Sequence, residues 1–175
     1  MVIFLNGASS SGKTSIAKEL LRTLKEPYFY LSIDHFLEPA MPLNINMDSE
    51  NDIRIIDQAI SGFNKALGAY SESINFIIVD HVLQHKSWLT EVATSLKSIE
   101  VFFVGVTAPL DILEMREQKR TDRQSGTAKA QVEVLNSYQY DLILNTAELS
   151  PEEAARKIIS TLSAGVALQN SALSI

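Results

Sequence analysis

Short runs of apolar residues alternate along this chain with longer segments in which apolar residues recur every three or four positions. A continuous apolar run is typical of a strand that is buried on both faces. The runs that predict strands are Val2–Leu5, Tyr28–Ile33, Phe76–Val79, Val101–Val106 and Leu142–Leu144. The periodic segments predict helices, because helical spacing places these apolar side chains on one face. They are Thr14–Lys25, Asp52–Tyr70, Pro109 to about Lys119, a stretch after Gly126, and Ser150 to about Leu162.

This alternation of strands and helices predicts an α/β fold. Apolar strands linked by helices form a parallel sheet that is covered on both faces. We therefore expect a three-layer α/β/α architecture with a five-stranded parallel sheet. The segment from Asp34 to Asn51 is expected to be irregular, because Pro39 and Pro42 break any long helix. The 175 residues are predicted to form a single domain, 1–175.

The turn between the first strand and the first helix carries the strongest chemical signal. Its residues match the phosphate-loop pattern G-x-x-x-x-G-K-[ST] at every position: Gly7, Ala8, Ser9, Ser10, Ser11, Gly12, Lys13 and Thr14. Glycine lets the backbone turn tightly enough for its N–H groups to face phosphate oxygens, and the following helix adds its positive end. Lys13 supplies a cation to the β- and γ-phosphates, and the Thr14 hydroxyl is a Mg²⁺ ligand. The loop therefore predicts an ATP-binding site.

Asp80 directly follows the apolar strand Phe76–Val79. A Walker-B-type carboxylate occupies such a position and holds Mg²⁺ directly or through water. The alternative is a strand-end aspartate that only caps a turn. In the presence of the phosphate loop, we predict Thr14 and Asp80 as the metal ligands.

Three of the six arginines gather at the polar break after the helix that begins at Pro109: Arg116, Arg120 and Arg123. A mobile lid around residues 116–127 would use these cations to neutralise the transferring phosphoryl group and to exclude water. The alternative is a solvated helix end whose cations meet the negative end of the helix dipole. We predict catalytic roles for Arg120 and Arg123 and nucleotide contact for Arg116.

Asp34 follows the second predicted strand. Ligands of parallel sheets bind at the carboxyl ends of the strands, and a carboxylate there can accept or orient the proton of an acceptor hydroxyl. The alternative is a helix or turn cap. We predict that Asp34 is the catalytic base and that Lys13 is also a catalytic residue. We assign no catalytic role to His35 or His81.

Composition limits the partners. The net charge of −6 disfavours nucleic acid or an anionic membrane as the main partner. The chain has no cysteine, which removes disulfides and thiolate chemistry and fits a cytoplasmic location. The apolar start is too short for a signal segment, and no run approaches the ~20 apolar residues of a membrane span. The expected partners are ATP, Mg²⁺ and a small hydroxylic acceptor, with a homo-oligomer left open.

Taken in order, these motifs resemble the chloramphenicol phosphotransferase family. The residues that carry the resemblance are Ile3 to Thr14, Ile33-Asp34, Ala40-Met41-Pro42, Ile78-Val79-Asp80, Gly105-Val106, Arg116-Glu117, Arg120 to Arg123, Tyr140-Asp141 and Ser150-Pro151-Glu152. The resemblance implies a nucleotide-kinase-like fold and phosphorylation of a hydroxyl of the antibiotic. It also implies Asp34 as the base, with Arg120 and Arg123 as lid arginines. Two positions depart from the family pattern: His81 replaces an expected acidic residue, and Asn136 lies near an expected histidine.

The acceptor is predicted to bind around residues 35–75, although residues 43–75 match the family poorly. The apolar residues there are Phe36, Leu37, Met41, Pro42, Leu43, Ile45 and Met47. They could line a pocket for a neutral aromatic ligand, or they could form a flap that packs against the core. A nucleoside-monophosphate kinase would need several arginines, but between Asp34 and Met115 the chain offers only Arg54. A sugar-acid kinase, with Arg54 on a carboxylate, and a non-catalytic nucleotide-binding module stay as alternatives. A GTPase would need an N-K-x-D motif, and the stretch 64–67 lacks its aspartate.

Overall fold

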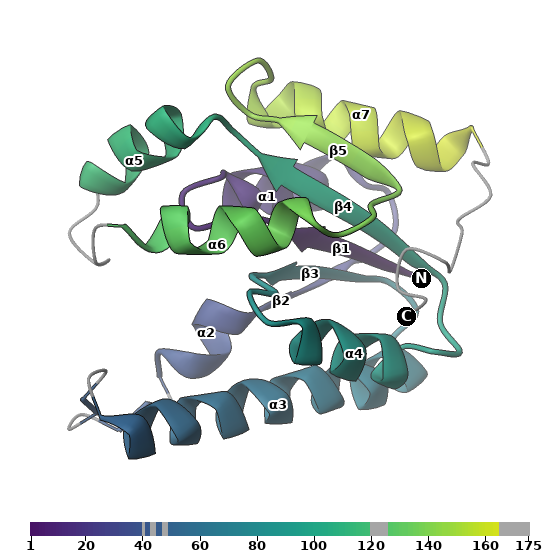
Figure 1. The fold of residues 1–175 in the computed structure, drawn as a ribbon. Helices are drawn as coiled ribbons and strands as arrows, with labels where there is room; N and C mark the ends of the chain where they lie inside the picture. The colour runs from purple at the N-terminus through teal and green to yellow at the C-terminus, as the bar shows by residue number, and fades with distance from the viewer. Residues whose placement is uncertain (40, 43–44, 47–48, 120–125, 165–175) are drawn as a thin grey trace.

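A computed structural model describes residues 1–39, 41–42, 45–46, 49–119 and 126–164. A five-stranded parallel sheet in the order β2-β3-β1-β4-β5 forms its centre (Figure 1). The strands are β1 (Val2–Asn6), β2 (Phe29–Ser32), β3 (Ile77–His81), β4 (Val101–Thr107) and β5 (Leu142–Asn145). The predicted α/β/α fold with five parallel strands is confirmed.

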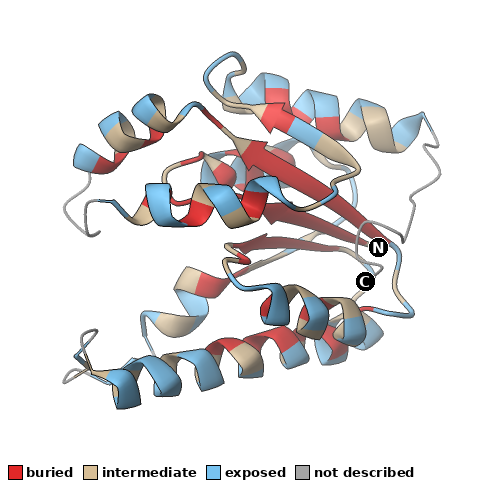
Figure 2. Ribbon diagram, in the orientation of Figure 1, coloured by how far each residue is buried: buried red, intermediate tan, exposed pale blue. Residues whose placement is uncertain are grey.

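Helices cover both faces of the sheet. They are α1 (Lys13–Thr23), α2 (Ile33–Leu37), α3 (Glu50–Ser73), α4 (Lys86–Ser95), α5 (Leu110–Gln118), α6 (Thr127–Asn136) and α7 (Pro151–Ser163). A strand directs successive side chains to opposite faces, so β1 contributes to two cores. Val2 and Phe4 pack toward α3 and α4, whereas Ile3 and Leu5 pack toward α1 and α7. Figure 2 shows the buried central strands β1, β3 and β4 between helices whose outer surfaces are exposed.

Two helices differ from the sequence-based expectation. The segment expected to be irregular from Asp34 contains most of α2, a helix of five residues that buries only Ile33. A helix this short is below the length at which apolar periodicity can be recognised. The helix α4 was not predicted, and it buries only Trp88 and Val92. These two side chains pack beside α3, so tertiary contact rather than a broad apolar stripe supports α4.

The last helix begins where the sequence predicts. Ser150 Oγ accepts a hydrogen bond from the Glu153 N–H (3.2 Å), and Glu153 Oε2 accepts one from the Ser150 N–H (2.9 Å). This reciprocal pair is a capping box, which satisfies two backbone donors at the start of α7. Within the described ranges, every helix is too short or too polar to span a lipid bilayer.

The strand order places a crevice at the carboxyl edge of the sheet. From β1 the chain first moves past β3 to β2 and later returns across β1 to β4 and β5. The connection that follows β1 leads to one side of the sheet, and the connection that follows its neighbour β4 leads to the other side. A crevice opens at the carboxyl ends of two such strands, and parallel α/β sheets bind their ligands there. The phosphate loop leaves β1 at this point.

Candidate active site

The phosphate loop adopts a backbone path that its residue types allow. A Cβ on Gly7 would lie 2.2 Å from the Val106 carbonyl oxygen, so only glycine fits beside β4. Gly12 has a positive φ of 97°, and Ser10 shares this left-handed region with a φ of 62°. A left-handed conformation costs a non-glycine residue about 1–2 kcal/mol. The loop therefore stores backbone strain at Ser10, whereas Gly12 adopts its conformation without that cost.

Three serine hydroxyls of the loop are buried and lack a hydrogen-bond partner among the described residues: Ser9, Ser10 and Ser11. Buried hydroxyls are normally hydrogen-bonded. They lie beside the N-terminus of α1, where backbone N–H groups and the helix dipole favour an anion. The loop thus has the donors that a phosphate group would satisfy.

Lys13 is folded back onto the loop. Its Nζ donates hydrogen bonds to the carbonyl oxygens of Gly7 (2.9 Å) and Ala8 (3.0 Å), and it lies 3.9 Å from Asp80 Oδ1. The side chain is only 8% exposed. Desolvation strengthens the interaction of such a cation with an incoming anion.

Asp80 meets the phosphate loop through Thr14. Thr14 Oγ1 donates to Asp80 Oδ2 at 2.7 Å, and the hydroxyl of Tyr30 donates to the same oxygen at 2.9 Å. Burial, and then the charge of Asp80, raise the pKa of Tyr30 well above its usual range, so its hydroxyl stays protonated. A hydroxyl and a carboxylate side by side fit Mg²⁺, a hard cation that takes one or two protein oxygens plus phosphates.

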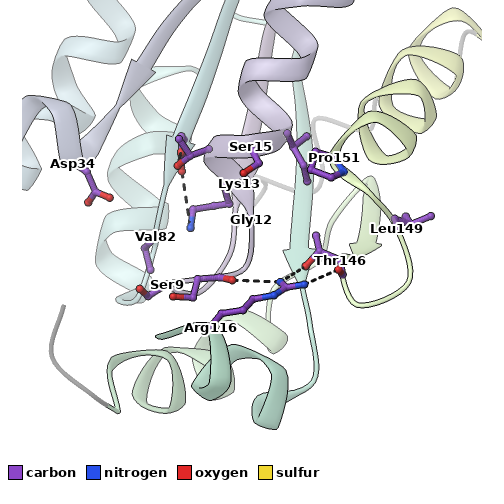
Figure 3. Close-up of a pocket in the computed structure, with 14 residues that line it drawn as sticks. Ser9, Gly12, Lys13, Ser15, Asp34, Val82, Arg116, Thr146, Leu149 and Pro151 are labelled. Atoms are coloured by element: carbon purple, nitrogen blue, oxygen red, sulfur yellow. Dashed lines mark hydrogen bonds and ion pairs between the residues drawn. The ribbon is translucent and has the colours of Figure 1, made fainter. Parts of the chain in front are cut away.

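A cavity of about 340 Å³ opens in front of these groups. Its lining residues come from the carboxyl edge of the sheet: Ser9, Ser10, Gly12, Lys13, Thr14, Ser15, Ile16, Asp34, Asp80, Val82, Arg116, Thr146, Leu149 and Pro151. Figure 3 shows Asp34 on one side of the cavity and Arg116 with Thr146 on the other, with the phosphate loop between them. A phosphate chain on the loop would therefore have a carboxylate beyond one end.

Arg116 is held by the turn after β5. Its Nη1 donates to Thr146 Oγ1 and its Nη2 to the Thr146 carbonyl oxygen, both at 2.8 Å, with a longer bond of 3.4 Å to the Ser10 carbonyl oxygen. Thr146 Oγ1 in turn donates to the Ser11 carbonyl oxygen at 2.8 Å. Thr146 thus joins Arg116 to the phosphate loop.

The helix α6 contacts the loop through Gln131. The Ser9 N–H donates to Gln131 Oε1 at 2.8 Å, and Gln131 Nε2 donates to Gln84 Oε1 at 3.0 Å. At its other end, α6 is capped by the buried Glu117 of α5, which accepts hydrogen bonds from the backbone N–H groups of Gly126 (2.8 Å) and Ala128 (3.1 Å). The two helices that flank the predicted lid segment are therefore tied to each other and to the phosphate loop.

His81 lies behind the site in a buried polar network. Its Nε2 lies 3.0 Å from Asn64 Oδ1, and Asn64 Nδ2 donates to Glu91, which also accepts from Ser61. Because the Asn64 amide nitrogen faces Glu91, its oxygen faces His81, and Nε2 carries the histidine proton. Burial lowers the pKa of His81 to about 3. His81, which departs from the family pattern, is thus a neutral residue of the packed interior.

The structure brings most of the sequence-predicted residues together. Lys13, Thr14, Asp34, Asp80 and Arg116 line one cavity. The other two predicted lid arginines lie outside the described residues, as do two members of the predicted acceptor set, Leu43 and Met47.

Three contributors were missed by the sequence-based prediction: Tyr30, Gln131 and Thr146. Thr146 directly follows a strand, so the rule that selected Asp34 and Asp80 could have selected it. No sequence signal marks Tyr30 or Gln131.

Comparisons with known proteins agree with this geometry. The family model of the chloramphenicol phosphotransferase-like proteins matches residues 1–163. A Mycobacterium tuberculosis (strain CDC 1551 / Oshkosh) protein named "Putative O-phosphotransferase" is 26% identical over 179 residues, covering 90% of this chain and 80% of that protein.

Solved structures show the same fold. A sugar kinase from Janibacter sp. HTCC2649 superposes with a TM-score of 0.69 at 16% identity, covering 98% of this chain and 96% of that one. The Mycobacterium tuberculosis APS kinase CysC, in complex with AMPPNP and APS, superposes with a TM-score of 0.64 at 20% identity, covering 93% and 96%. The match over residues 1–163 decides the family: this chain belongs to the chloramphenicol phosphotransferase-like proteins, on the fold of the phosphate-loop small-molecule kinases.

Proposed function

We propose that this protein transfers the γ-phosphoryl group of ATP to a hydroxyl of a neutral small molecule. The observation that carries the proposal is the composition of one cavity. The phosphate loop with Lys13, the oxygen pair of Thr14 and Asp80, and the carboxylate of Asp34 all line it. These are the parts that phosphoryl transfer to a hydroxyl requires.

The nucleotide would lie along the loop with its base toward the turn after β5. The backbone N–H groups at the start of α1 and the Lys13 ammonium would bind the phosphates. Arg116 offers a planar cation that can stack on an aromatic base, and Leu149 and Pro151 add apolar surface beside it. When bound with the nucleotide, Mg²⁺ would neutralise charge on the phosphate oxygens, and Thr14 and Asp80 would hold it.

Asp34 would orient the acceptor hydroxyl and take its proton. The acceptor oxygen forms a bond to the γ-phosphorus, the bond from that phosphorus to the β–γ bridging oxygen breaks, and ADP leaves with the bridging oxygen. Lys13 stabilises negative charge on the transferring group. We keep Arg120 and Arg123 in the proposal as the lid cations, on the strength of their sequence positions and the family match.

The position of Arg54 favours a neutral acceptor. Arg54, the cation expected to meet a carboxylate or phosphate on the acceptor, is exposed, and its guanidinium donates to Asn51 on the same helix. Aromatic surface lies nearby, since Phe36 is 43% exposed and its ring packs on Phe63. A neutral, partly aromatic alcohol fits these surroundings better than a doubly charged nucleoside monophosphate.

A panel of acceptors tests the proposal. The purified protein is incubated with Mg-ATP and chloramphenicol, a sugar acid or a nucleoside monophosphate, and products are detected by mass spectrometry. We expect a product that is phosphorylated on a hydroxyl of a neutral acceptor, and we expect Asp34→Asn to slow its formation by about 10²-fold or more. Efficient phosphorylation of only the sugar acid or the nucleotide would overturn the neutral-acceptor assignment. ATP binding without phosphoryl transfer to any alcohol would contradict the kinase assignment and favour a non-catalytic nucleotide-binding module.

A further inference from the structure

Tyr30 reaches the proposed metal-binding carboxylate from the neighbouring strand. It lies opposite Ile78 in the register of β2 with β3, and Asp80 follows two residues later on the same face. A diagonal neighbour of this kind is within reach of a long side chain. The Tyr30 hydroxyl accordingly donates to Asp80 Oδ2 at 2.9 Å.

Among the described residues, this is one of two hydrogen bonds that orient the carboxylate. The same oxygen accepts from Thr14 Oγ1 at 2.7 Å, while Oδ1 lies 3.9 Å from Lys13 Nζ. In the proposed nucleotide complex, a lone pair of the Thr14 hydroxyl oxygen would face the metal, and coordination would constrain the direction of its hydrogen. Tyr30 would then be the second donor to the Asp80 carboxylate, one that no metal contact redirects.

The alternative position of Asp80 is a close ion pair with Lys13. Both groups are nearly buried, Asp80 at 5% and Lys13 at 7% exposed, so their attraction is weakly screened. A carboxylate freed from Tyr30 could rotate toward the ammonium. That movement would remove a ligand from the metal and a cation from the phosphates at once.

We propose that Tyr30 is a positioning residue that holds Asp80 toward the metal of the metal–nucleotide complex and away from Lys13. The inference rests on the proposed function, since it assumes that a divalent cation enters with ATP. Packing alone does not require the hydroxyl. The ring packs with the α1 and α7 core and meets the ring of His35 edge-on at 5.6 Å, contacts that phenylalanine would keep.

The test is Tyr30→Phe, read out by calorimetric ATP binding with EDTA and with Mg²⁺. The matched control is Tyr28→Phe, because Tyr28 packs in the same core but its ring contacts Phe76 instead. In Tyr30→Phe we expect the affinity gained from Mg²⁺ to fall about 10-fold, the lower end of the range for partners that orient metal ligands. ATP affinity in EDTA should stay within about 2-fold of wild type, as expected when no metal is involved. Tyr28→Phe should behave as wild type in both conditions.

Three outcomes would overturn the inference. The first is an unchanged Mg²⁺ effect in Tyr30→Phe. The second is an equal loss of affinity in EDTA, which would make Tyr30 a support of the loop. The third comes from a double-mutant cycle with Asp80→Ala, which removes the acceptor oxygen: if Tyr30→Phe still lowers the Mg²⁺ effect in that background, it does not act through Asp80. If the wild-type protein does not bind ATP at all, both the proposed function and this inference are overturned.

Discussion

Lys13 makes hydrogen bonds to the phosphate loop, and we propose that it also binds the phosphates that the loop would hold. Its ammonium donates to two loop carbonyl oxygens, Gly7 and Ala8, at 2.9 and 3.0 Å. An incoming phosphate would exchange these neutral acceptors for charged ones, which make stronger hydrogen bonds. The side chain is thus preorganised near its proposed position and contributes little to the hydrophobic cores.

Lys13→Ala tests this role. We expect turnover to fall by about 10²–10³-fold, the usual effect of removing one transition-state donor. Stability should fall by about 1–3 kcal/mol, because the substitution leaves the buried carbonyl oxygens of Gly7 and Ala8 without this donor. Steady-state kinetics with Mg-ATP and thermal unfolding measure the two effects. Lys18→Ala, on the exposed face of α1, is the control; near-normal turnover in Lys13→Ala would refute the phosphate-loop assignment.

Asp34 lies in the first turn of α2, where a carboxylate can also stabilise a helix end. The two roles separate in Asp34→Asn, which keeps the shape but cannot take a proton. We expect ATP affinity to be retained and kcat to fall by about 10²-fold or more. Binding is measured by calorimetry and turnover by ADP release. An unchanged kcat with a lower melting temperature would identify Asp34 as a cap.

At the scale of elements, Glu117 links the two helices that border the predicted lid. It is 3% exposed and belongs to α5, yet both carboxylate oxygens accept N–H groups at the start of α6. A carboxylate at a helix N-terminus also matches the helix dipole. The ends of the segment that carries Arg120 and Arg123 are therefore joined by one side chain.

Glu117→Ala should loosen this junction. Hydrogen bonds to a charged group contribute about 1.5–3 kcal/mol, and we expect the unfolding free energy to fall by that amount when the bonds to the Gly126 and Ala128 N–H groups are lost. We also expect kcat to fall more than ATP affinity, because the lid cations would act mainly on the transferring group. Denaturant unfolding and kinetics are the measurements. Glu114→Ala, one turn earlier on α5, serves as the control; equal effects in both variants would argue against a specific cap.

At the scale of the whole molecule, the His81 network joins the sheet to the two helices of one layer. His81 ends β3, Asn64 and Ser61 belong to α3, and Glu91 belongs to α4. The His81 ring also packs among Phe4, Phe63 and Trp88. Protonation would place an uncompensated charge in this core, although the nearby Asp34 partly offsets the effect of burial and of Lys13.

The stability of the protein should therefore decrease on acidification. The folded-state pKa of His81 is about 3, below its ordinary value of 6.5, so the unfolded chain binds the proton first. Stability from this group is fully present above about pH 6.5 and is lost as the pH falls toward about 3, by at most about 1.4 kcal/mol per pH unit. Urea unfolding of wild type and His81→Gln across this range measures the difference. An identical pH slope in the two proteins would contradict the prediction.

Contiguous sequence determined the parts of this protein whose causes are local. The phosphate loop was predictable because its eight residues, Gly7–Thr14, form one turn and one helix start. The same holds for the buried strands and for the α7 capping box, whose partners are three residues apart. Asp34 and Asp80 could be selected because each follows a strand, and parallel strands end at one edge.

Only the tertiary structure decided which distant side chains complete the site. Tyr30 lies 50 residues from Asp80, Thr146 lies 30 from Arg116, and Gln131 lies 122 from Ser9. Hydrogen bonds of this kind depend on strand order and helix packing. The residue type alone does not identify them, because most residues with a hydroxyl or amide side chain lie on the protein surface. The burial of His81 and Glu117 arises in the same way. Nε2 of His81 and the carboxylate of Glu117 are hydrogen-bonded by partners that the fold brings in from other helices, and no local pattern encodes those contacts.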